Sequence, residues 1–227
     1  SQYCENITFL NCDFTPSHER TFSSNADLLH FSGCKGKIVI KNCKSYGTHD
    51  DFINVHGTHL KIVAVNEKER RVIVRFANPN SRGFQAFFKG DTIEFIRRDT
   101  LLPYYRTKVL RFSKLNDTDI ELTLSALPHK TPKNGACAIA DAIGDVVYNY
   151  TQNPRVRIEN NYFGYGAARG VLCTTRKKAV IRGNVFENIA GAALLIEDDC
   201  NFWYESGYTK NVIFRKNKVI DCGFENG

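Results

Sequence analysis

A short pattern that recurs along the chain constrains its fold more than any other feature of the sequence. The recurring runs alternate apolar with polar side chains and end in Asn or Cys; they span residues 7–12, 38–43, 156–161, 179–184 and 212–217. The runs that end at Asn161 and Asn184 are 23 residues apart, and the wider spacings fit the same unit with longer loops. Short strands and turns that repeat at this length, without a helical period, are typical of the coils of a parallel β-helix. Leucine-rich repeats have a similar length but need a Leu framework, which this sequence lacks.

In four of these units a second, more apolar run follows the first, over residues 27–31, 51–55, 169–173 and 192–196. Equivalent positions of successive coils lie about 4.8 Å apart in such a fold. We therefore predict an asparagine ladder at the recurring Asn positions. Cys12 and Cys43 share that position, so they are predicted to stack as buried thiols, and a disulfide between them stays open as an alternative.

The repeat is interrupted between Cys43 and Asn161. Five runs there alternate with period two and are separated by turn clusters; they cover residues 60–65, 71–76, 91–96, 108–112 and 119–124. Asn66–Arg70 is predicted to form the first hairpin turn. We predict an all-β chain in which residues 1–59 and 146–227 form parallel β-helix coils and residues 60–145 form a small inserted antiparallel β-barrel.

Charge and cysteine usage narrow the range of partners. The chain has 31 basic and 24 acidic residues, a net charge of +7 with its six His neutral, and its basic residues are scattered along the sequence. The longest basic run is Arg176–Lys178, and no recognised nucleic-acid module accompanies it, so a solvated surface is favoured over nucleic-acid binding. The eight Cys show no C-x-x-C spacing, which disfavours zinc.

No stretch approaches the roughly 18 apolar residues that a spanning helix needs, so we predict no membrane span. The chain starts at Ser1, contains no Met and shows a strand-like pattern by Ile7. These features favour a processed form or a fragment.

Acidic residues occupy one equivalent position of the second runs. Asp27 and Asp51 are one coil apart, and Arg169 holds the same position in the next coil after the insert. Stacked coils would bring the two carboxylates and the guanidinium into one column, which should raise the pKa of one carboxyl and lower that of the other. Asp50 precedes Asp51, and we predict a bend that turns both outward.

Further polar side chains follow on the same strands and on the loop after them. His30, Asn54, His56, Thr174 and Glu197 come from successive coils, and the loop 200–209 carries the only Trp, Trp203, with Glu205. Hydroxyl groups of a sugar need paired donors and acceptors, and an aromatic ring suits its C–H face. The set therefore predicts a sugar-binding groove.

These residues lie in segments that resemble glycoside hydrolase family 110, the bacterial α-1,3-galactosidases. The resemblance rests on residues 25–36, 49–58, 169–176, 194–199 and 203–207, with Asp-Asp followed by Asn-Val-His-Gly, and Trp-Tyr-Glu-Ser-Gly, as its most specific parts. It implies a right-handed β-helix with barrel insertions and no metal or other cofactor. It also implies a secreted or periplasmic bacterial enzyme that removes terminal α-1,3-linked galactose with inversion. Whole members are much longer, so the chain resembles a central portion of them.

We hypothesise an exo-acting inverting α-galactosidase for terminal α-galactosides, either blood-group-B-like or linear α-1,3-galactosyl glycans. An inverting pair needs carboxyls about 6.5 to 9.5 Å apart, whereas side chains one coil apart are nearer the retaining distance of about 5 Å. Asp27 and Asp51 are therefore predicted to act as one unit, with Asp50 or Glu197 as the opposing carboxyl. The predicted substrate-binding residues are His30, Asn54, His56, Gln85, Arg169, Thr174, Arg176, Asp198, Trp203 and Glu205.

Two other functions fit the same groove. One is a glycan-binding β-helix without catalysis, similar to an adhesin or a tailspike segment, which would not depend on Asp51. The other is a polysaccharide lyase, which abstracts a proton beside a uronate carboxylate and usually requires calcium or a Lys or Arg base. The positive charge keeps the lyase open, while an Asp-rich column with a single Arg is better suited to the hydrolysis of a neutral sugar.

Overall fold

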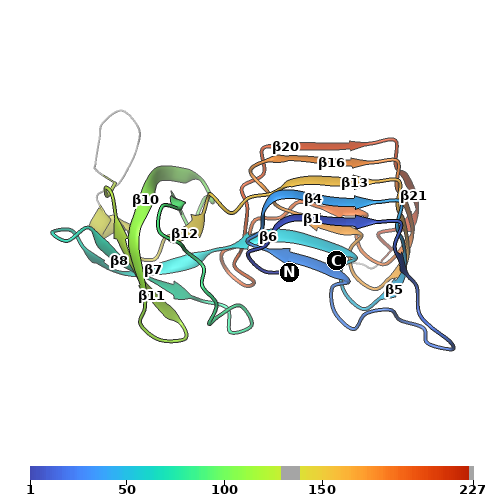
Figure 1. The fold of residues 1–227 in the computed structure, drawn as a ribbon, viewed down its shortest axis with the longest axis horizontal. Helices are drawn as coiled ribbons and strands as arrows, with labels where there is room; N and C mark the ends of the chain where they lie inside the picture. Colours follow the sequence, from blue (N-terminus) through green and yellow to red (C-terminus); the bar gives the residue numbers. More distant parts are fainter. Residues whose placement is uncertain (129–138, 225–227) are drawn as a thin grey trace. The chain divides into compact units, whose positions relative to one another are not determined.

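A computed structural model describes residues 1–128 and 139–224 of the chain (Figure 1). These residues form two compact units. The first, here called the coil unit, comprises residues 1–56, 153–197 and 209–224; the second, here called the barrel unit, comprises residues 57–152 and 198–208. Each is described by itself. Among the described residues, no helical segment has the length and hydropathy that crossing a membrane would require.

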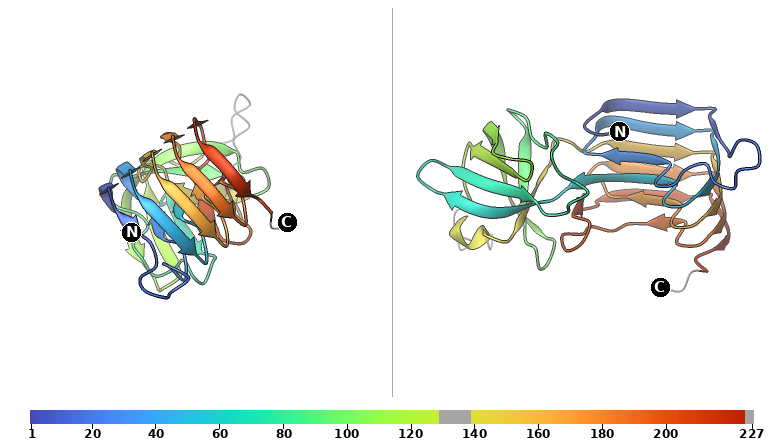
Figure 2. Two further views of the ribbon diagram at one scale, coloured as in Figure 1. Left: turned by 90° about the vertical axis from the view of Figure 1, so that its right-hand side faces the viewer. Right: turned by 90° about the horizontal axis from the view of Figure 1, so that it is seen from below.

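Three parallel sheets build the coil unit; each of the first four coils contributes one strand to each sheet, and a fifth coil adds a strand to the first two sheets (Figures 1 and 2). The first sheet has the order β1 (Glu5–Leu10), β4 (Lys35–Lys41), β13 (Arg155–Glu159), β16 (Lys178–Arg182) and β20 (Asn211–Arg215). The second has the order β2 (Asp13–Phe14), β5 (Lys44–Thr48), β14 (Tyr162–Gly166), β17 (Val185–Ile189) and β21 (Lys218–Cys222). The third contains β3 (Leu29–Ser32), β6 (Ile53–Thr58) as far as His56, β15 (Val171–Cys173) and β18 (Leu194–Leu195). This arrangement confirms the predicted all-β, β-helix-like fold.

A residue with a left-handed backbone conformation recurs where the chain turns from the first sheet into the second. Its φ lies between 54° and 66° at Asn11, Asn42, Asn160, Gly183 and Lys216. Asn and Gly adopt this conformation more readily than other residues, because a short polar side chain or the absence of Cβ lowers its cost. The recurring Asn and Gly in the sequence therefore mark the corner of each coil.

The predicted asparagine ladder occupies the next position and is confirmed. The side-chain oxygen of Asn161 accepts the backbone N–H of Cys43 at 2.8 Å, that of Asn184 accepts the N–H of Asn161 at 2.9 Å, and that of Asn217 accepts the N–H of Asn184 at 2.9 Å. Each bond ties one coil to the next through an otherwise unpaired backbone amide. The same position holds Cys12 and Cys43 as free thiols rather than a disulfide; Cys43 is buried and Cys12 is half-buried. Cys137 lies outside the described residues.

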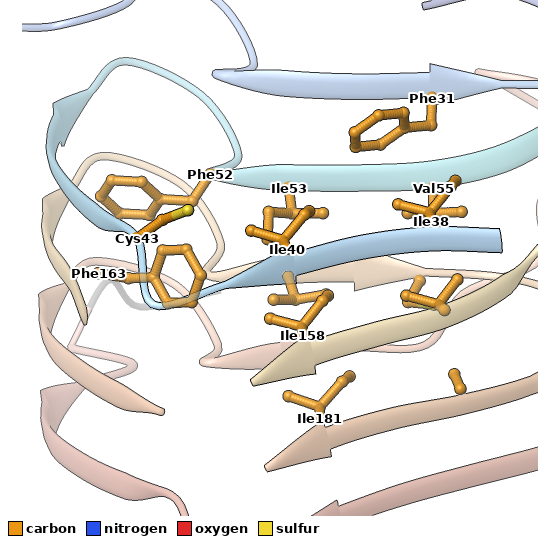
Figure 3. Packing of buried hydrophobic residues seen from close by; sticks show 14 of the residues in the cluster. Phe31, Ile38, Ile40, Cys43, Phe52, Ile53, Val55, Ile158, Phe163 and Ile181 are labelled. Carbon is orange, nitrogen blue, oxygen red and sulfur yellow. The ribbon is translucent and has the colours of Figure 1, made fainter. Parts of the chain in front are cut away.

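Apolar side chains from all three sheets fill the interior of the coils. Ile38, Ile40, Ile158 and Ile181 point inward from the first sheet and are at most 1% exposed (Figure 3). Because every second residue of these strands is apolar, one face of the sheet is buried and the other meets solvent. The inward rows keep the coils in register: Val156, for instance, lies opposite Ile38 on one side and Ala179 on the other.

The barrel unit is a closed antiparallel barrel of six strands. Their order is β10 (Pro103–Lys114), β11 (Asp119–Leu124), β8 (Arg71–Phe76), β7 (Leu60–Asn66), β12 (Val146–Asn149) and β9 (Thr92–Ile96), and a short 3₁₀ helix, η1 (Ile139–Ala142), precedes β12. The predicted hairpin turn joins β7 to β8, where the N–H of Arg70 donates to the carbonyl of Glu67 at 3.2 Å. Residues 198–208 pack in this unit, and their strand β19 (Glu205–Ser206) pairs antiparallel with Gly57 and Thr58.

Candidate active site

The register of the third sheet brings the predicted column together in the coil unit. Ile53 pairs with Leu29 on one side and with Val171 on the other. Asp27, Asp51 and Arg169 each lie two residues before these partners, so they stack at the same corner of three coils. This corner is where the chain enters the third sheet.

Asp51 is the most buried member of the column. Its side chain is 0% exposed, and its two carboxylate oxygens face Arg169, with Nε to Oδ1 at 2.7 Å and Nη2 to Oδ2 at 2.9 Å. The backbone N–H of Arg169 also donates to Oδ1 at 3.0 Å. Burial nevertheless raises the pKa of Asp51 to about 6, because loss of hydration outweighs the attraction of Arg169.

Asp27 has the opposite electrostatic character. Its Oδ2 lies 2.7 Å from Nδ1 of His30, and its Oδ1 accepts the backbone N–H of Asp51 at 3.1 Å. Burial alone would raise the pKa of Asp27, but the bonds from His30, Asp51 and the side chain of Asn54 together lower it. Two carboxyls of one column therefore differ in proton affinity, but the lower pKa comes from His30 and not from Arg169, which the sequence had suggested.

Asp50 completes a cluster of three carboxylates. Its Oδ1 also accepts the N–H of Asp51, at 3.0 Å, and carboxylate oxygens of Asp27, Asp50 and Asp51 all lie within 4.8 Å of one another. Asp50 and Asp27 are half-buried, so both reach the surface while Asp51 lies beneath them. Three carboxylates at this spacing could hold a hard cation, but both oxygens of Asp51 are already engaged by Arg169, which disfavours that use.

A pair of histidines extends the cluster along the third sheet. Nε2 of His30 lies 2.6 Å from Nε2 of His56. In the pairing of β3 with β6, His30 lies opposite Asn54 and Ser32 lies opposite His56. His30 is exposed, whereas Asn54 and His56 are each 4% exposed. At this distance one ring nitrogen must carry the proton and the other must accept it. Asp27, His30 and His56 thus form one hydrogen-bonded chain.

The other predicted residues of the coil unit are Glu197, Thr174 and Arg176. Glu197 is exposed after β18. Thr174 is 2% exposed, and its hydroxyl donates to the carbonyl of Val55 at 3.2 Å. Arg176 is half-buried, and its backbone N–H donates to the side chain of Asn153 at 3.0 Å.

Four predicted substrate-binding residues belong to the barrel unit. Gln85 is exposed, and its side-chain amide donates to the carbonyl of Phe87 at 3.3 Å. Trp203 is 51% exposed and lies edge-to-face with Phe202 at 4.8 Å between ring centroids. Glu205 is half-buried in β19. Asp198 binds Nε2 of His59 through its Oδ1 at 2.8 Å.

Sequence reasoning missed two features of the loop that carries Trp203. His59, 0% exposed, anchors the start of the loop through Asp198. Asp199 then accepts the backbone N–H groups of residues 201–204 at 2.5 to 3.2 Å. Asp side chains often accept backbone N–H groups of the residues that follow them in a turn, so Asp199 itself is the signal. From the sequence alone, however, such an Asp looks the same as a solvent-exposed one.

The two bulky residues beside the carboxylates are part of the core. Phe52 is 0% exposed and packs against Phe163 with 5.5 Å between ring centroids (Figure 3). Leu28 is half-buried and packs against the same core cluster. These two side chains therefore fill the core beneath the corner at which Asp27, Asp51 and Arg169 stack.

The coil unit with its inserted six-strand barrel defines an all-β, β-helix-like protein. The family model GLAA-B beta-barrel domain II matches residues 71–134. The chain is 42% identical over 225 residues to an α-1,3-galactosidase A of Akkermansia muciniphila, covering 98% of this chain and 36% of that protein. It is 39% identical over 224 residues to an α-1,3-galactosidase A of Bacteroides thetaiotaomicron and 36% identical over 230 residues to an α-1,3-galactosidase B of Phocaeicola vulgatus; each match covers 98% of this chain and 38% of the relative.

The chain is therefore a homologue of the α-1,3-galactosidases A and B, glycoside hydrolase family 110, along nearly its whole length. This confirms the resemblance found in the sequence. The chain spans somewhat more than a third of the length of the curated relatives it matches.

Proposed function

We propose that the carboxylate cluster is the catalytic centre of an exo-acting, inverting α-1,3-galactosidase. The observation that carries the proposal is the geometry of the cluster, in which carboxylate oxygens of Asp27, Asp50 and Asp51 lie within 4.8 Å of one another and Asp51 is buried against Arg169. Burial raises the pKa of Asp51 to about 6, whereas the hydrogen bonds that Asp27 accepts outweigh its burial and lower its pKa. A glycosidase needs one carboxyl that holds a proton and one that remains ionised. The homology to α-1,3-galactosidases supports α-galactoside glycans as the substrate class. Within that class we propose terminal α-1,3-linked galactose on blood-group-B-like or linear glycans.

The roles follow from exposure and hydrogen bonding. Asp27 and Asp51 act as one unit. Asp27 stays ionised, and Asp51, buried beneath it, holds a proton more readily than Asp27 does. The sequence left Asp50 and Glu197 as candidates for the opposing carboxyl. Asp50 lies within 4.8 Å of Asp27 and Asp51, closer than the roughly 6.5 to 9.5 Å of an inverting pair, so we assign this role to Glu197, which is exposed after β18. One carboxyl protonates the glycosidic oxygen as the bond from C1 to that oxygen breaks, and the other removes a proton from the water that attacks C1 from the opposite face.

Neighbouring polar groups hold the sugar in this proposal. His30, Asn54 and His56 lie along the third sheet next to Asp27 and offer donors and acceptors for hydroxyl groups. Trp203, exposed in the barrel unit, stays a substrate-binding prediction from the sequence, because an exposed aromatic ring is of the kind that packs on the C–H face of a sugar. Secretion or transfer to the periplasm stays a prediction from the family.

The test measures hydrolysis of an α-1,3-linked galactobiose and records by proton NMR which anomer of galactose forms first. We expect β-galactose, with rate losses of about 10² or more in Asp27→Asn, Asp50→Asn and Asp51→Asn. Asp221→Asn is the matched control, because Asp221 is an exposed carboxylate of the same unit on β21.

Each outcome bears on a different part of the proposal. Initial α-galactose would reject inversion, and full activity in Asp51→Asn would reject the two-carboxyl unit. Retained galactoside binding without release, in the unmodified chain and the variants alike, would favour a non-catalytic glycan-binding β-helix. Release of an unsaturated uronate from an acidic polymer would instead favour a lyase.

A further inference from the structure

The positive charge of the protein is concentrated on one sheet. The five strands of the first sheet carry two acidic residues, Glu5 and Glu159, and eight basic ones: Lys35, Lys37, Lys41, Arg155, Arg157, Lys178, Arg182 and Arg215. This net charge of +6 is nearly the whole +7 of the chain. The second sheet carries two basic and three acidic residues, and the third carries no Lys, Arg, Asp or Glu. The basic residues, scattered in the sequence, are therefore collected by the stacking of the coils.

One row across this sheet consists of three basic side chains without a carboxylate. Arg155 of β13 pairs with Lys37 of β4, and the register of β13 with β16 places Lys178 on its other side. All three are exposed, and in the described part of the chain none forms an ion pair. Neighbouring strands are about 4.8 Å apart, and like charges that face each other across strands destabilise a sheet. The row is an electrostatic cost to the fold, which a bound anion would relieve.

The two acidic residues of the sheet are already neutralised within it. Glu159, 3% exposed, accepts hydrogen bonds from Arg157 at 2.9 Å and from Arg182 at 3.0 Å. Glu5 lies 3.3 Å from Nζ of Lys35. Neither carboxylate reaches the row of Lys37, Arg155 and Lys178, so the surplus charge is left to solvent or to a ligand.

The surface between the basic rows is aliphatic. Val39, Val180 and Ile213 lie in one register row with Arg157 and are half-buried. The outward positions of these strands carry no aromatic side chain, which single-stranded nucleic acids use for base stacking. Basic rows flanking an aliphatic row match a chain of sugar rings that bears acidic groups, since the rings offer C–H faces between the charges.

We propose that the outward face of the first sheet binds an anionic glycan, whose sulfate or carboxylate groups pair with Lys37, Arg155 and Lys178. This site lies on a different sheet from the carboxylate cluster and does not depend on the proposed galactosidase activity. It would hold the protein on an acidic polysaccharide through charge-assisted hydrogen bonds.

The test measures binding of heparin, hyaluronan and a single-stranded DNA of matched charge to the 227-residue chain at several salt concentrations. Heparin presents sulfates and hyaluronan only carboxylates, so the two glycans distinguish the anionic group. The variant Lys37→Gln, Arg155→Gln, Lys178→Gln removes the unpaired row. Its matched control, Lys68→Gln, Lys89→Gln, Lys108→Gln, removes three exposed basic side chains from the barrel unit.

We expect at least one of the glycans to bind, with an affinity that falls as salt rises. We also expect the row variant to lose roughly tenfold or more in affinity while the control loses less than about twofold. Because the row is mutually repulsive, the row variant should unfold at the same or a higher temperature. Equal losses in both variants, tighter binding of the DNA, or no binding of either glycan would overturn the proposal.

Discussion

The carboxylate of Asp51 and the guanidinium of Arg169 contact each other through two pairs of atoms, at 2.7 and 2.9 Å, although Asp51 is fully buried and the side chain of Arg169 is 35% exposed. The pair is thus asymmetric: water reaches the cation but not the anion. Burial raises the pKa of Asp51 to about 6 in spite of its partner. The ionised carboxylate is therefore less stable in the folded protein than in water.

This asymmetry predicts how stability depends on pH. The pKa of Asp51 is higher in the folded state than in the unfolded state, where it is close to 4. Its contribution to stability is then complete below about pH 4 and is lost as pH rises through about 6, a decrease on the order of 2 to 3 kcal/mol. Asp51→Asn cannot titrate, so the free energy of unfolding of the native chain minus that of the variant should fall between pH 4.5 and pH 7.5.

Urea denaturation of both proteins across this range measures the difference. The lowered pKa of Asp27 acts in the opposite direction, because its contribution is present above its unfolded value and lost as pH falls. It is common to both proteins and cancels to first order in the comparison. If this difference in the free energy of unfolding stays constant or increases with pH, the attraction of Arg169 outweighs burial in its effect on the pKa of Asp51.

The column could be predicted because it depends only on the repeat. Once the coils were aligned, Asp27, Asp51 and Arg169 had to stack, since strands one coil apart pair at a fixed register. The asparagine ladder followed from the same alignment. Both inferences needed the length of the repeat and the residue types at one position, and no long-range information.

Other parts of the site depend on contacts that no local pattern encodes. His59 and Asp198 are 139 residues apart in sequence, and nothing near either residue indicates that they pair. The sequence predicted that the Asp51 carboxylate turns outward, whereas it is fully buried and both of its oxygens face Arg169. Scattered basic residues also gave no sign of the basic face, because their proximity arises only when the coils stack.

Asn184 is predicted to be the most sensitive position of the ladder. It is 1% exposed; its oxygen accepts the backbone and side-chain N–H groups of Asn161, and its amide donates to the carbonyl of Ile158 at 2.9 Å. Asn184→Ala leaves these groups buried without partners, which should cost about 2 to 4 kcal/mol in urea denaturation. Asn217→Ala, at the half-buried end of the ladder, should cost about 1 kcal/mol, since water can replace its bonds. Equal losses of stability in Asn184→Ala and Asn217→Ala would argue against the buried ladder hydrogen bonds as the source of the loss.

Gly166 lies against Phe52, which joins the core to the corner that carries Asp51. A Cβ added at Gly166 would lie 2.6 Å from Cε2 of Phe52. Phe52 follows Asp51 in the sequence, and its ring is fully buried. Gly166→Ala should therefore destabilise the fold by about 1 to 3 kcal/mol and lower the catalytic rate by moving Asp51. The double variant Gly166→Ala, Phe52→Leu provides room for the methyl group, so its loss should be smaller than the sum of the two single losses. If the losses of the double variant in stability and rate equal the sums of the two single losses, Gly166 and the Phe52 ring are not coupled.

Asp199 is predicted to order the loop that presents the only Trp of the chain. Its carboxylate accepts N–H groups from four consecutive residues that include Phe202 and Trp203, and the side chain of Asn78 donates to the carbonyl of Phe202 at 3.0 Å. Burial alone would raise the pKa of Asp199, but these backbone hydrogen bonds outweigh burial and lower it, which favours the ionised carboxylate as the acceptor.

Asp199→Ala should therefore increase the mobility of Trp203 and cost about 1 to 2 kcal/mol in the barrel unit, because four amides lose a common acceptor. Since Trp203 is the only Trp, its fluorescence anisotropy and its quenching by acrylamide report directly on this loop. Asp99→Ala, an exposed acid of the same unit, is the control and should leave both signals unchanged. If Trp203 binds galactoside as proposed, Asp199→Ala should also raise KM more than it lowers kcat. Unaltered anisotropy in Asp199→Ala would show that Asn78 and the His59–Asp198 pair order the loop without Asp199.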